Sequence, residues 1–522
     1  MSLDELVKRL AAAPMAGALA ICATLQGCDH LHQSKGERLA RSYCGACHLF
    51  PEPALLDKKT WESRVLPEMA LRVGIRTAQS PFKDPFQNQD TVPASATLSD
   101  GDWQRIVAYY RDHAPVSLPP QSLPALPRRD PPFFHTEPFL PGMESSGIIT
   151  LLKVDSALGR IFVGDAARKS LQVFDWDRRR LAELSLGSPP TDVISDPTRV
   201  LVLESGILSP NDEPKGRLVQ YDVGRGDSLR FDRVLIDSLY RPVFVQRYDF
   251  DKDGVDEYVI CEFGNNRGRL ALYKADGAKY ARHVLDPSPG AIRFEIRDMT
   301  GDGAPDIVAL FAQGNERIEL FVNDGRGNFP RPPRILARFP PVYGSMYFTL
   351  ADFTGDGRPD ILYVNGDNFD YSRIAKPYHG VRILENDGRN DFHERYFFPI
   401  YGAARAEVAD FDGDGDLDIL TTSNFAGAAH APDQAVVYLE NTGRLTFQPY
   451  EFTAAAGNQW NLMAMADLDR DGRPDVIIGA MNLESVASYQ QGFGQRSSGQ
   501  GTPLLVLQNR LRALRPRTPD TR

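Results

Sequence analysis

Apolar and polar residues alternate in short stretches throughout residues 146–511, and this alternation is the dominant pattern of the chain. A period of two is typical of strands that bury one face. In the clearest example, the strand at 405–409 leads into an acidic turn, which is followed by strands at 418–420, 436–441 and 445–452. The 43 glycines and 39 prolines also indicate many turns and few long helices. The pattern therefore predicts units of four short strands.

The acidic turn allows five of these units to be aligned, because Asp-x-(Asp/Thr)-x-Asp-Gly recurs along the chain. The turns begin at residues that lie 49, 54, 58 and 57 positions apart: Asp249, Asp298, Asp352, Asp410 and Asp467. Two units without the acidic turn precede them, near 148–176 and 192–221. Four strands per about 50 residues is the period of a propeller blade. The sequence thus predicts a mainly β fold with a seven-bladed β-propeller over 146–511, and six or eight blades are the alternatives.

Closing such a ring requires the last blade to borrow a strand from elsewhere in the chain. The apolar segment 504–507 is the last strand of the pattern. We expect residues 133–140, or the first strand after Gly147, to pair beside it, because an unpaired edge would otherwise favour aggregation.

Each of the five turns carries the side chains that a hard cation requires. Oxygens at positions 1, 3, 5 and 9, a backbone carbonyl at position 7 and a glycine at position 6 suit an ion with about six to eight oxygen ligands, which favours Ca²⁺. The predicted side-chain ligands are, turn by turn, Asp249, Asp251, Asp253 and Glu257; Asp298, Thr300, Asp302 and Asp306; Asp352, Thr354, Asp356 and Asp360; Asp410, Asp412, Asp414 and Asp418; and Asp467, Asp469, Asp471 and Asp475. About five calcium sites are therefore expected.

These turns are not EF-hands, because position 12 lacks the bidentate glutamate. That position holds Ile260, Ala309, Tyr363, Thr421 and Ile478. The formal charge of the chain is −10, which five Ca²⁺ ions would cancel. The acidity also argues against a nucleic-acid partner, since phosphates are bound by clustered lysine and arginine. The alternative is a set of Asp-Gly turns that hold no metal.

The repeats resemble the FG-GAP or VCBS-type blades of integrin-α-like β-propellers over about 70% of the chain. The resemblance implies that the calcium turns are structural and that they lie between the first two strands of each blade. It implies no substrate, because such propellers serve adhesion, ligand binding and enzyme scaffolding alike.

Residues 1–27 have the layout of an export signal, with Lys8 and Arg9 before a run of small apolar residues. The following Leu25-Gln26-Gly27-Cys28 resembles the lipobox of bacterial lipoproteins, which implies that Cys28 becomes the lipidated first residue. We therefore expect a lipid-anchored protein of the bacterial cell envelope that faces the periplasm or the exterior. Secretion without a lipid, with cleavage nearby, is the alternative.

Cys44-Gly45-Ala46-Cys47-His48 is the most specific local motif of the chain. Its spacing is that of covalent c-type haem attachment. Two thiols on one helical turn can bond the two vinyl groups of one haem, while His48 offers a ring nitrogen to the iron. A thioredoxin-like CxxC would need a βαβ context, which is missing, and a structural disulfide would leave His48 without a role. One covalent haem is therefore expected at Cys44, Cys47 and His48.

The surroundings of this motif resemble a small all-α cytochrome c domain, assigned to residues 28–116, so that the whole chain looks like bacterial exported proteins that join such a domain to a propeller. Helices are expected at 36–43 and 57–73, and Ser99 with Asp102 predicts the start of a third. The apolar face of the third helix consists of Trp103, Ile106, Val107 and Tyr110. This tyrosine-bearing helix resembles the C-terminal helix of cytochromes c.

Met69 is the candidate for the second axial iron ligand, because it is the first methionine after the haem motif. A thioether at that position raises the reduction potential. Two alternatives remain open: Met69 belongs to an apolar helical stripe with Leu66 and Val73, or His113 binds the iron instead.

Two segments are expected to lie outside the domains. Nine prolines between 115 and 141 predict a semi-rigid, extended spacer, and residues 117–145 are assigned as a linker. The arginine-rich tail at 512–522 is expected to be disordered.

Functional residues of the propeller are expected on connections that are longer than a blade needs. The connection over 365–380 is long, and it carries Asn368, Tyr371, Lys376, Tyr378 and His379. Together with 423–433 and 458–461, it could form a polar, aromatic pocket opposite the calcium turns. Ordinary turn residues with a solvated histidine are the alternative.

Three functions fit this organisation. The adopted prediction is an envelope-anchored c-type haem protein in electron transfer, whose propeller binds an unidentified redox partner protein or small molecule. In the second, the propeller is a periplasmic dehydrogenase that passes electrons to the haem. In the third, it is an adhesion or glycan-binding module with an ancillary haem. The sequence shows no Ser-His-Asp elbow, zinc motif, nucleotide-binding glycine loop or tryptophan repeat, which argues against an enzyme without deciding the question.

Overall fold

The structure is a computed structural model, and it describes residues 33–76, 93–122, 128–140, 143, 145, 147–330, 332–367, 374–424, 434–481 and 502–511. The chain divides into two compact units, Met1–Ser80 with Pro93–Val116 and Pro81–Val92 with Ser117–Arg522. The export segment, Cys28 and the tail at 512–522 lie outside the described residues. Within the described part of the chain, no helix is long and apolar enough to cross a membrane.

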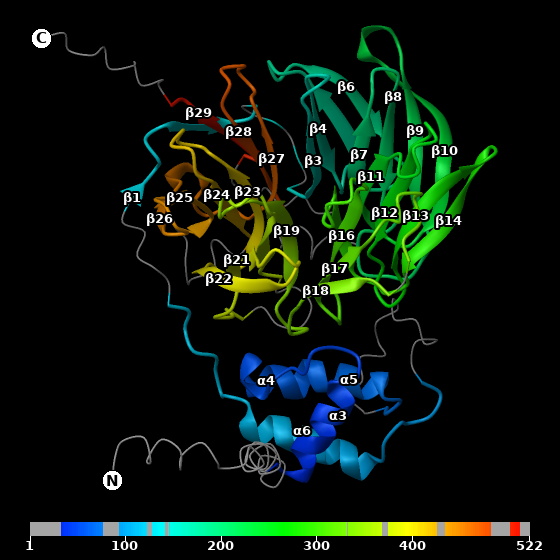
Figure 1. The fold of residues 1–522 in the computed structure, drawn as a ribbon, viewed down its shortest axis with the longest axis vertical. Coiled ribbons are helices and arrows are strands. Elements are labelled where there is room, and N and C mark those ends of the chain that lie inside the picture. Colours follow the sequence, from blue (N-terminus) through cyan, green and yellow to red (C-terminus); the bar gives the residue numbers. More distant parts are fainter. Residues whose placement is uncertain are drawn as a thin grey trace, which may run out of the picture. The chain divides into compact units, whose positions relative to one another are not determined.

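The smaller unit is helical (Figure 1). It contains α3 (Lys35–Cys44), the 3₁₀ turn η1 (Pro53–Leu55), α4 (Lys58–Thr60), the π-helical turn η2 (Trp61–Val65), α5 (Leu66–Arg72) and α6 (Asp100–His113). The three predicted helices are confirmed, and the second of them runs from α4 through η2 into α5. Ser34, Asp57 and Ser99 begin these helices, because each side chain accepts a hydrogen bond from a backbone N–H of the first turn.

The apolar face of α6 differs by one residue from the expected face. Trp103 and Ile106 are buried as expected, whereas Val107 is only half-buried. Tyr109 is buried in addition, because its Cβ lies against Gly36 of α3. The core of this unit therefore depends on a close crossing of α3 and α6.

Gly36→Val is expected to destabilise the helical unit by roughly 1–3 kcal/mol. A Cβ at this position would lie 2.5 Å from the carbonyl oxygen of Arg105, so α3 must move away from α6. Gly101→Ala is the matched control, since a Cβ there meets nothing closer than 3.6 Å and alanine favours the helix by up to about 1 kcal/mol. Thermal unfolding followed by the helical band of circular dichroism measures both variants. Equal melting temperatures would contradict the close crossing.

The described strands of the larger unit form seven sheets, which are the blades of a β-propeller (Figure 1). Blade 1 contains β3 (Ile149–Asp155), β4 (Arg160–Asp165), β5 (Ser170–Phe174) and β6 (Arg180–Ser185); blade 2 contains β7 (Pro190–Ser195), β8 (Arg199–Glu204), β9 (Gly216–Val223) and β10 (Leu229–Leu239). Blade 3 contains β11 (Pro242–Tyr248), β12 (Glu257–Glu262), β13 (Arg269–Asp276) and β14 (Lys279–Asp286); blade 4 contains β15 (Ala291–Arg297), β16 (Asp306–Phe311), β17 (Arg317–Phe321) and β18 (Arg334–Arg338).

The remaining blades follow the same order. Blade 5 contains β19 (Ser345–Ala351), β20 (Asp360–Asn365), β21 (Gly380–Asn386) and β22 (Phe392–Pro399). Blade 6 contains β1 (Arg128–Arg129), β23 (Ala403–Ala409), β24 (Asp418–Ser423), β25 (Val436–Asn441) and β26 (Phe447–Glu451). Blade 7 contains β2 (Phe134–Pro138), β27 (Trp460–Ala466), β28 (Asp475–Ala480) and β29 (Leu504–Asn509). The 3₁₀ turn η4 (Arg225–Asp227) lies between β9 and β10 of blade 2, and the 3₁₀ turn η6 (Thr453–Ala455) follows β26 of blade 6.

Seven blades exclude the alternatives of six and eight. The two units without an acidic turn, near 148–176 and 192–221, are blades 1 and 2. The first strands of consecutive blades contact one another in turn, and β27 of the last blade contacts β3 of the first, which closes the ring.

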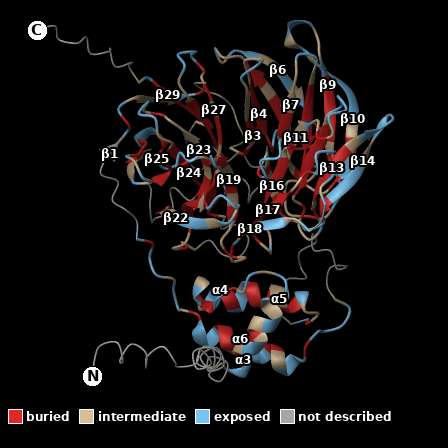
Figure 2. Cartoon of the chain, viewed as in Figure 1, coloured by how far each residue is buried: buried red, intermediate tan, exposed pale blue. Residues whose placement is uncertain are grey.

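The core of the propeller lies between adjacent blades. Phe250, Phe294 and Phe311, for example, pack together between blades 3 and 4. The second strands, such as β12 and β20, are buried at every residue, because each blade is covered on both faces by its neighbours. Exposed residues are concentrated on fourth strands such as β10 and β14 (Figure 2).

Blade 7 is closed by β2, which confirms the expected pairing of 133–140 with the last strand. His135 pairs with Gln508, and Pro138 pairs with Leu505, in an antiparallel ladder. In addition, β1 pairs with β26 of blade 6 in a parallel arrangement.

The expectation that 117–145 is a free spacer is therefore wrong for much of this segment. Strands β1 and β2 belong to blades 6 and 7, and the backbone N–H of Gln121 donates to the hydroxyl of Tyr401 at 2.8 Å. The prolines permit this, because both strands are edge strands and proline is incompatible only with a central position.

Candidate functional site

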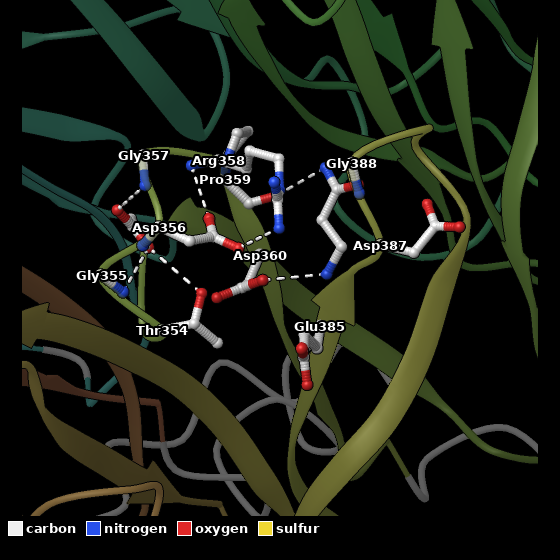
Figure 3. Close-up of polar contacts among 12 residues, drawn as sticks. Thr354, Gly355, Asp356, Gly357, Arg358, Pro359, Asp360, Glu385, Asp387 and Gly388 are labelled. Atoms are coloured by element: carbon white, nitrogen blue, oxygen red, sulfur yellow. Dashed lines mark hydrogen bonds and ion pairs between the residues drawn. The ribbon is translucent and has the colours of Figure 1, made fainter.

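The five acidic turns join the first strand of a blade to its second strand, in blades 3 to 7. Figure 3 shows this turn in blade 5, with Thr354, Asp356 and Asp360 on the turn and Glu385 and Asp387 at the end of β21. Because neighbouring strands are antiparallel, the turns lie at one end of the ring, and the connections from second to third strands lie at the other end. The predicted ligand loop and the predicted calcium turns are thus at opposite ends of the propeller.

The carboxylate at position 1 organises each turn by accepting a hydrogen bond from the backbone N–H of the glycine at position 6. The distances are 3.0 Å for Gly254 to Asp249, 2.8 Å for Gly303 to Asp298, 2.8 Å for Gly357 to Asp352, 3.1 Å for Gly415 to Asp410 and 2.9 Å for Gly472 to Asp467. These glycines have φ between 83° and 102°, in the left-handed region that other residues rarely adopt. The turn therefore requires glycine at position 6.

The carboxylate at position 9 is buried and joins the turn to the sheet. Asp360 accepts a hydrogen bond from the N–H of Phe353 at 3.0 Å and another from the N–H of Asn386 at 2.9 Å. The equivalent asparagines of blades 4, 6 and 7 are Asn323, Asn441 and Asn509. Their recurrence at the end of the third strand is the sequence signal that could have revealed this role.

In three turns the carboxylates at positions 1, 3 and 9 converge, so that one oxygen of each lies within 4.8 Å of the others. These groups are Asp249, Asp251 and Glu257; Asp410, Asp412 and Asp418; and Asp467, Asp469 and Asp475. The turns of blades 4 and 5 hold Thr300 and Thr354 at position 3, so they have one carboxylate fewer. The predicted ligands at position 5 are outside these groups and bond to the turn itself, as Asp414 does by accepting from the N–H of Asp416 at 3.1 Å.

The turn of blade 6 has the least compensated negative charge. Burial, together with the charges of Asp414 and Glu440, raises the pKa of Asp412 to about 6. Burial raises the pKa of Asp418 to about 7. Among the residues that the structure describes, no lysine or arginine forms an ion pair with these carboxylates or with Asp410. A divalent cation would supply the missing positive charge.

In blade 3 a lysine reaches the turn. The ammonium nitrogen of Lys274, on β13, lies 2.9 Å from a carboxylate oxygen of Asp251 and 3.7 Å from one of Glu257. Burial opposes the charge of Lys274, but the two carboxylates outweigh it and raise its pKa above the usual value. Blade 3 thus combines predicted calcium ligands with an internal cation.

The haem motif begins at the last residue of α3. Gly45 ends the helix, because its N–H bonds to the carbonyl of Arg41, and residues 45–47 form a turn. The expectation that both thiols share one helical turn is therefore wrong, and Cys47 lies beyond the helix. Neither Cys44 nor Cys47 is in a disulfide, and burial raises the pKa of Cys44 to about 11.

His48 is half-buried, and the hydrogen bond of one ring nitrogen fixes which nitrogen remains for a metal. Its Nδ1 lies 2.9 Å from the carbonyl oxygen of Leu49, and it can only donate to that oxygen. The proton is then on Nδ1, so Nε2 carries the lone pair. Burial lowers the pKa of His48, which also favours the neutral form that binds metals.

The two candidates for the second iron ligand occupy helices. Met69 is half-buried on α5, where Leu66 is buried and Val73 is half-buried, so the apolar stripe exists. His113 ends α6, and its Nδ1 lies 2.8 Å from the carbonyl oxygen of Tyr109.

The predicted ligand loop is described in part. Asn368 and Tyr371 lie outside the described residues. Tyr378 has a packing role, since it stacks on Tyr343 with ring centroids 4.8 Å apart and donates to a backbone carbonyl. His379 is 1% exposed, so the alternative of a solvated histidine is wrong.

Several buried polar atoms at or near His379 have no hydrogen-bond partner among the residues that the structure describes. Its Nδ1 accepts from the N–H of Gly402 at 3.4 Å, which places the ring proton on Nε2, and among the described residues the buried Nε2 has no hydrogen-bond partner. Gln121 donates to the carbonyl of His379 at 2.6 Å, while its own side-chain oxygen is unpartnered. The side-chain oxygen of Asn424, whose N–H bonds to Gly402, is also unpartnered.

The charge state of His379 is set by its surroundings. Burial first, and then the positive charges of Lys376 and Arg382, lower the pKa of His379 well below its usual value. Lys376 is itself buried. The imidazole of His379 is therefore neutral. Its N–H, which has no acceptor among the described residues, lies at the end of the propeller opposite the acidic turns.

Residues 249–309 and 298–363 match the FG-GAP-like repeat. The chain contains FG-GAP repeats. The matched residues include the acidic turns of blades 3, 4 and 5.

The chain is similar in part to integrin α chains. The chain is 26% identical over 157 residues to integrin alpha-IIb of Mus musculus, across 27% of this chain and 15% of the relative. It is 30% identical over 95 residues to integrin alpha-IIb of Homo sapiens, across 17% of this chain and 9% of the relative. The matching segments thus span less than a fifth of the length of these integrins.

Two solved structures are similar at the level of the propeller. The Dos1 propeller has a TM-score of 0.42 and 11% identity, across 69% of this chain and 78% of that chain. Saccharomyces cerevisiae Sqt1 has a TM-score of 0.42 and 9% identity, across 70% of this chain and 97% of that chain.

Proposed function

We propose that this protein is an envelope-anchored c-type haem protein in electron transfer, and that its calcium-stabilised propeller binds a redox partner protein or a small molecule. The observation that carries the proposal is the arrangement of two thiols and a histidine at the end of α3, where Nδ1 of the histidine donates to a backbone carbonyl. Metal-binding histidines generally donate their second ring nitrogen to a carbonyl or carboxylate in this way.

The chain's own residues fit the attachment of one haem. Cys44 and Cys47 would form the thioether bonds, and His48 would bind the iron through Nε2. Bound haem supplies one-electron redox chemistry. Met69 is the proposed second ligand, because it is the first methionine after the haem motif. His113 is the alternative, because the bond of its Nδ1 to the carbonyl of Tyr109 leaves Nε2 available, as in His48.

The propeller turns fit calcium in the order of their uncompensated charge. Blade 6 fits best, because its carboxylates converge without a cation. Blade 7 has a second converging group, and blades 4 and 5 offer two aspartates and a threonine at the same positions. Bound calcium would brace the connection between the first two strands of each blade, as the resemblance to integrin-α-like propellers implies.

Absorption spectroscopy tests the haem proposal. The full chain is produced with a c-type maturation system, purified and measured in oxidised and reduced form. We expect a Soret band, a sharp α-band on reduction, and a haem stain that survives a denaturing gel. Purified, folded protein without a Soret band would overturn the proposal.

The cluster at His379 favours a second candidate, in which the propeller binds a small polar molecule and, as a dehydrogenase, passes its electrons to the haem. A buried N–H with no acceptor and nearby unpartnered amide oxygens suit a ligand that has both hydroxyl and carbonyl groups. Catalytic reduction of the haem by such a molecule, without any protein partner, would favour this candidate. Its loss in His379→Ala, with the spectrum unchanged, would assign the site.

A further inference from the structure

One position on the third strand decides whether an acidic turn has its own cation. The residue at position 9 of each turn begins the second strand, and the strand register places it opposite a residue of the third strand. Opposite Glu257 in blade 3 this residue is Lys274, because Tyr258 pairs with Tyr273. The corresponding residues of blades 4 to 7 are Val322, Glu385, Glu440 and Gln508.

In blades 3, 6 and 7 the side chain at this position acts on position 3 of the turn, whereas Glu385 of blade 5 pairs with Arg395 at 2.7 Å. Gln508 donates to the carboxylate of Asp469 at 2.7 Å, and the charge of Glu440 acts on Asp412. Lys274 makes the same approach to Asp251, at 2.9 Å. Only blade 3 places a positive charge there among the five turns, all of which the structure describes.

The ammonium group of Lys274 lies against the turn, and the lysine side chain is 23% exposed. It contacts Asp251 and Glu257, whose side chains are 25% and 5% exposed. A Cβ added at Gly327, in the connection after β17, would lie 3.0 Å from both the ammonium nitrogen and the Cβ of Asp251, so blade 4 covers this group. The ammonium therefore occupies space beside the carboxylates that a metal ion would need.

Two further substitutions in blade 3 match this arrangement. Position 9 is Glu257, one methylene longer than the aspartate of the other turns, and its Oε1 faces Lys274 while its Oε2 accepts from the N–H of Phe250 at 2.8 Å. The asparagine that holds the position-9 carboxylate elsewhere is replaced by Ala275. The asparagines donate through their backbone N–H, so what is particular to blade 3 is the ammonium group of Lys274, which lies 3.7 Å from Oε1 of Glu257.

We propose that Lys274 is the resident cation of blade 3, so that this turn binds no calcium while the turns that lack such a lysine do. The inference rests on the calcium part of the proposed function. It lowers the expected number of sites from about five to about four, because Lys274 pairs with two of the ligands predicted in blade 3, Asp251 and Glu257. Two cations cannot share these carboxylates at such short range without strong repulsion.

Calcium stoichiometry of the full chain tests the inference through reciprocal variants. Lys274→Met is expected to bind one Ca²⁺ more per chain than the unmodified protein, because it frees the converging carboxylates. Glu440→Lys places a lysine at the equivalent position of blade 6 and is expected to bind one Ca²⁺ fewer. Lys252→Met removes an exposed lysine from the same turn of blade 3 and should leave the number unchanged. Equilibrium dialysis with radioactive calcium gives these numbers.

The outcomes separate the inference from the proposal on which it rests. If the unmodified chain binds calcium but Lys274→Met gains no ion, the inference is wrong. If neither the unmodified chain nor any variant binds calcium, the calcium part of the proposed function fails, and the inference with it. Should Lys274→Met fold poorly without calcium, rescue of its melting temperature by added Ca²⁺, with no rescue in Lys274→Arg, supports the inference, and the absence of rescue counts against it.

Discussion

Replacing both Cys44 and Cys47 by serine is expected to abolish covalent haem attachment. Serine cannot form the thioether bonds, so haem that enters the fold would be lost on denaturation. The measurement is the haem stain after a denaturing gel, together with the Soret absorbance of the native protein. Cys261→Ala is the matched control, because it removes the buried cysteine of β12 and should leave the stain at full intensity.

Single replacements test the two proposed iron ligands separately from the thioether bonds. His48→Ala should keep part of the covalent stain but lose the normal reduced spectrum, because the thiols remain while the iron ligand is absent. Met69→Leu should keep the full stain and lower the reduction potential if the thioether binds iron. An unchanged potential in Met69→Leu would assign Met69 to the apolar stripe of α5.

Removal of calcium is expected to lower the melting temperature of the propeller by roughly 10 °C. An ion present at about 100 times its dissociation constant stabilises the folded state by about 2.7 kcal/mol, so the four turns of blades 4 to 7, when filled, contribute about 11 kcal/mol. A change of 1 kcal/mol shifts the melting temperature by about 2 °C or less in a unit of this size. Differential scanning calorimetry with and without chelator measures the shift.

Variants in and outside the turns show whether the shift arises from the acidic turns. Asp412→Asn should remove about a quarter of the shift, because it disables one of four turns. Asp237→Asn changes an exposed carboxylate of β10 outside the turns and should preserve the whole shift. A shift that survives Asp412→Asn intact would show that blade 6 holds no calcium.

The calcium-free protein should lose stability as the pH rises from about 4 to about 7. The pKa values of Asp412, Asp418 and Asp475 are raised to about 6, 7 and 6, above the value of about 3.9 in unfolded chains. In this window the folded state binds more protons than the unfolded state, so the free energy of unfolding falls with increasing pH. Urea unfolding across this range, with and without calcium, measures the dependence, which saturating calcium should reduce.

Much of the fold follows from local patterns of the sequence. The recurring Asp-x-Asp turn set the blade period, and the edge-strand argument identified 133–140 as the closing strand, as the ladder of β2 and β29 confirms. The helices were predictable because Ser34, Asp57 and Ser99 are local signals within one turn of each helix start.

The errors arose where contacts join distant residues. The role of Lys274 depends on the register between β12 and β13, and position along the chain does not give that register. The burial of Tyr109 in place of Val107 depends on Gly36, which permits α3 to approach α6 closely. The proline-rich segment was assigned as a linker because its composition indicates a stiff backbone. Composition does not show that short strands of this segment pair with the outer edges of blades 6 and 7.

The position of β2 has a consequence for biogenesis. Its partner β29 follows every other described strand along the chain, whereas β2 precedes every other strand of blades 1 to 5 and 7. In a chain that is synthesised from its N-terminus, β2 stays unpaired while the intervening blades form. The ring closes only after β29 is available to pair with β2. A nascent chain that stalls before β29 lacks the partner of β2 and exposes an unpaired strand edge, which favours association with other chains.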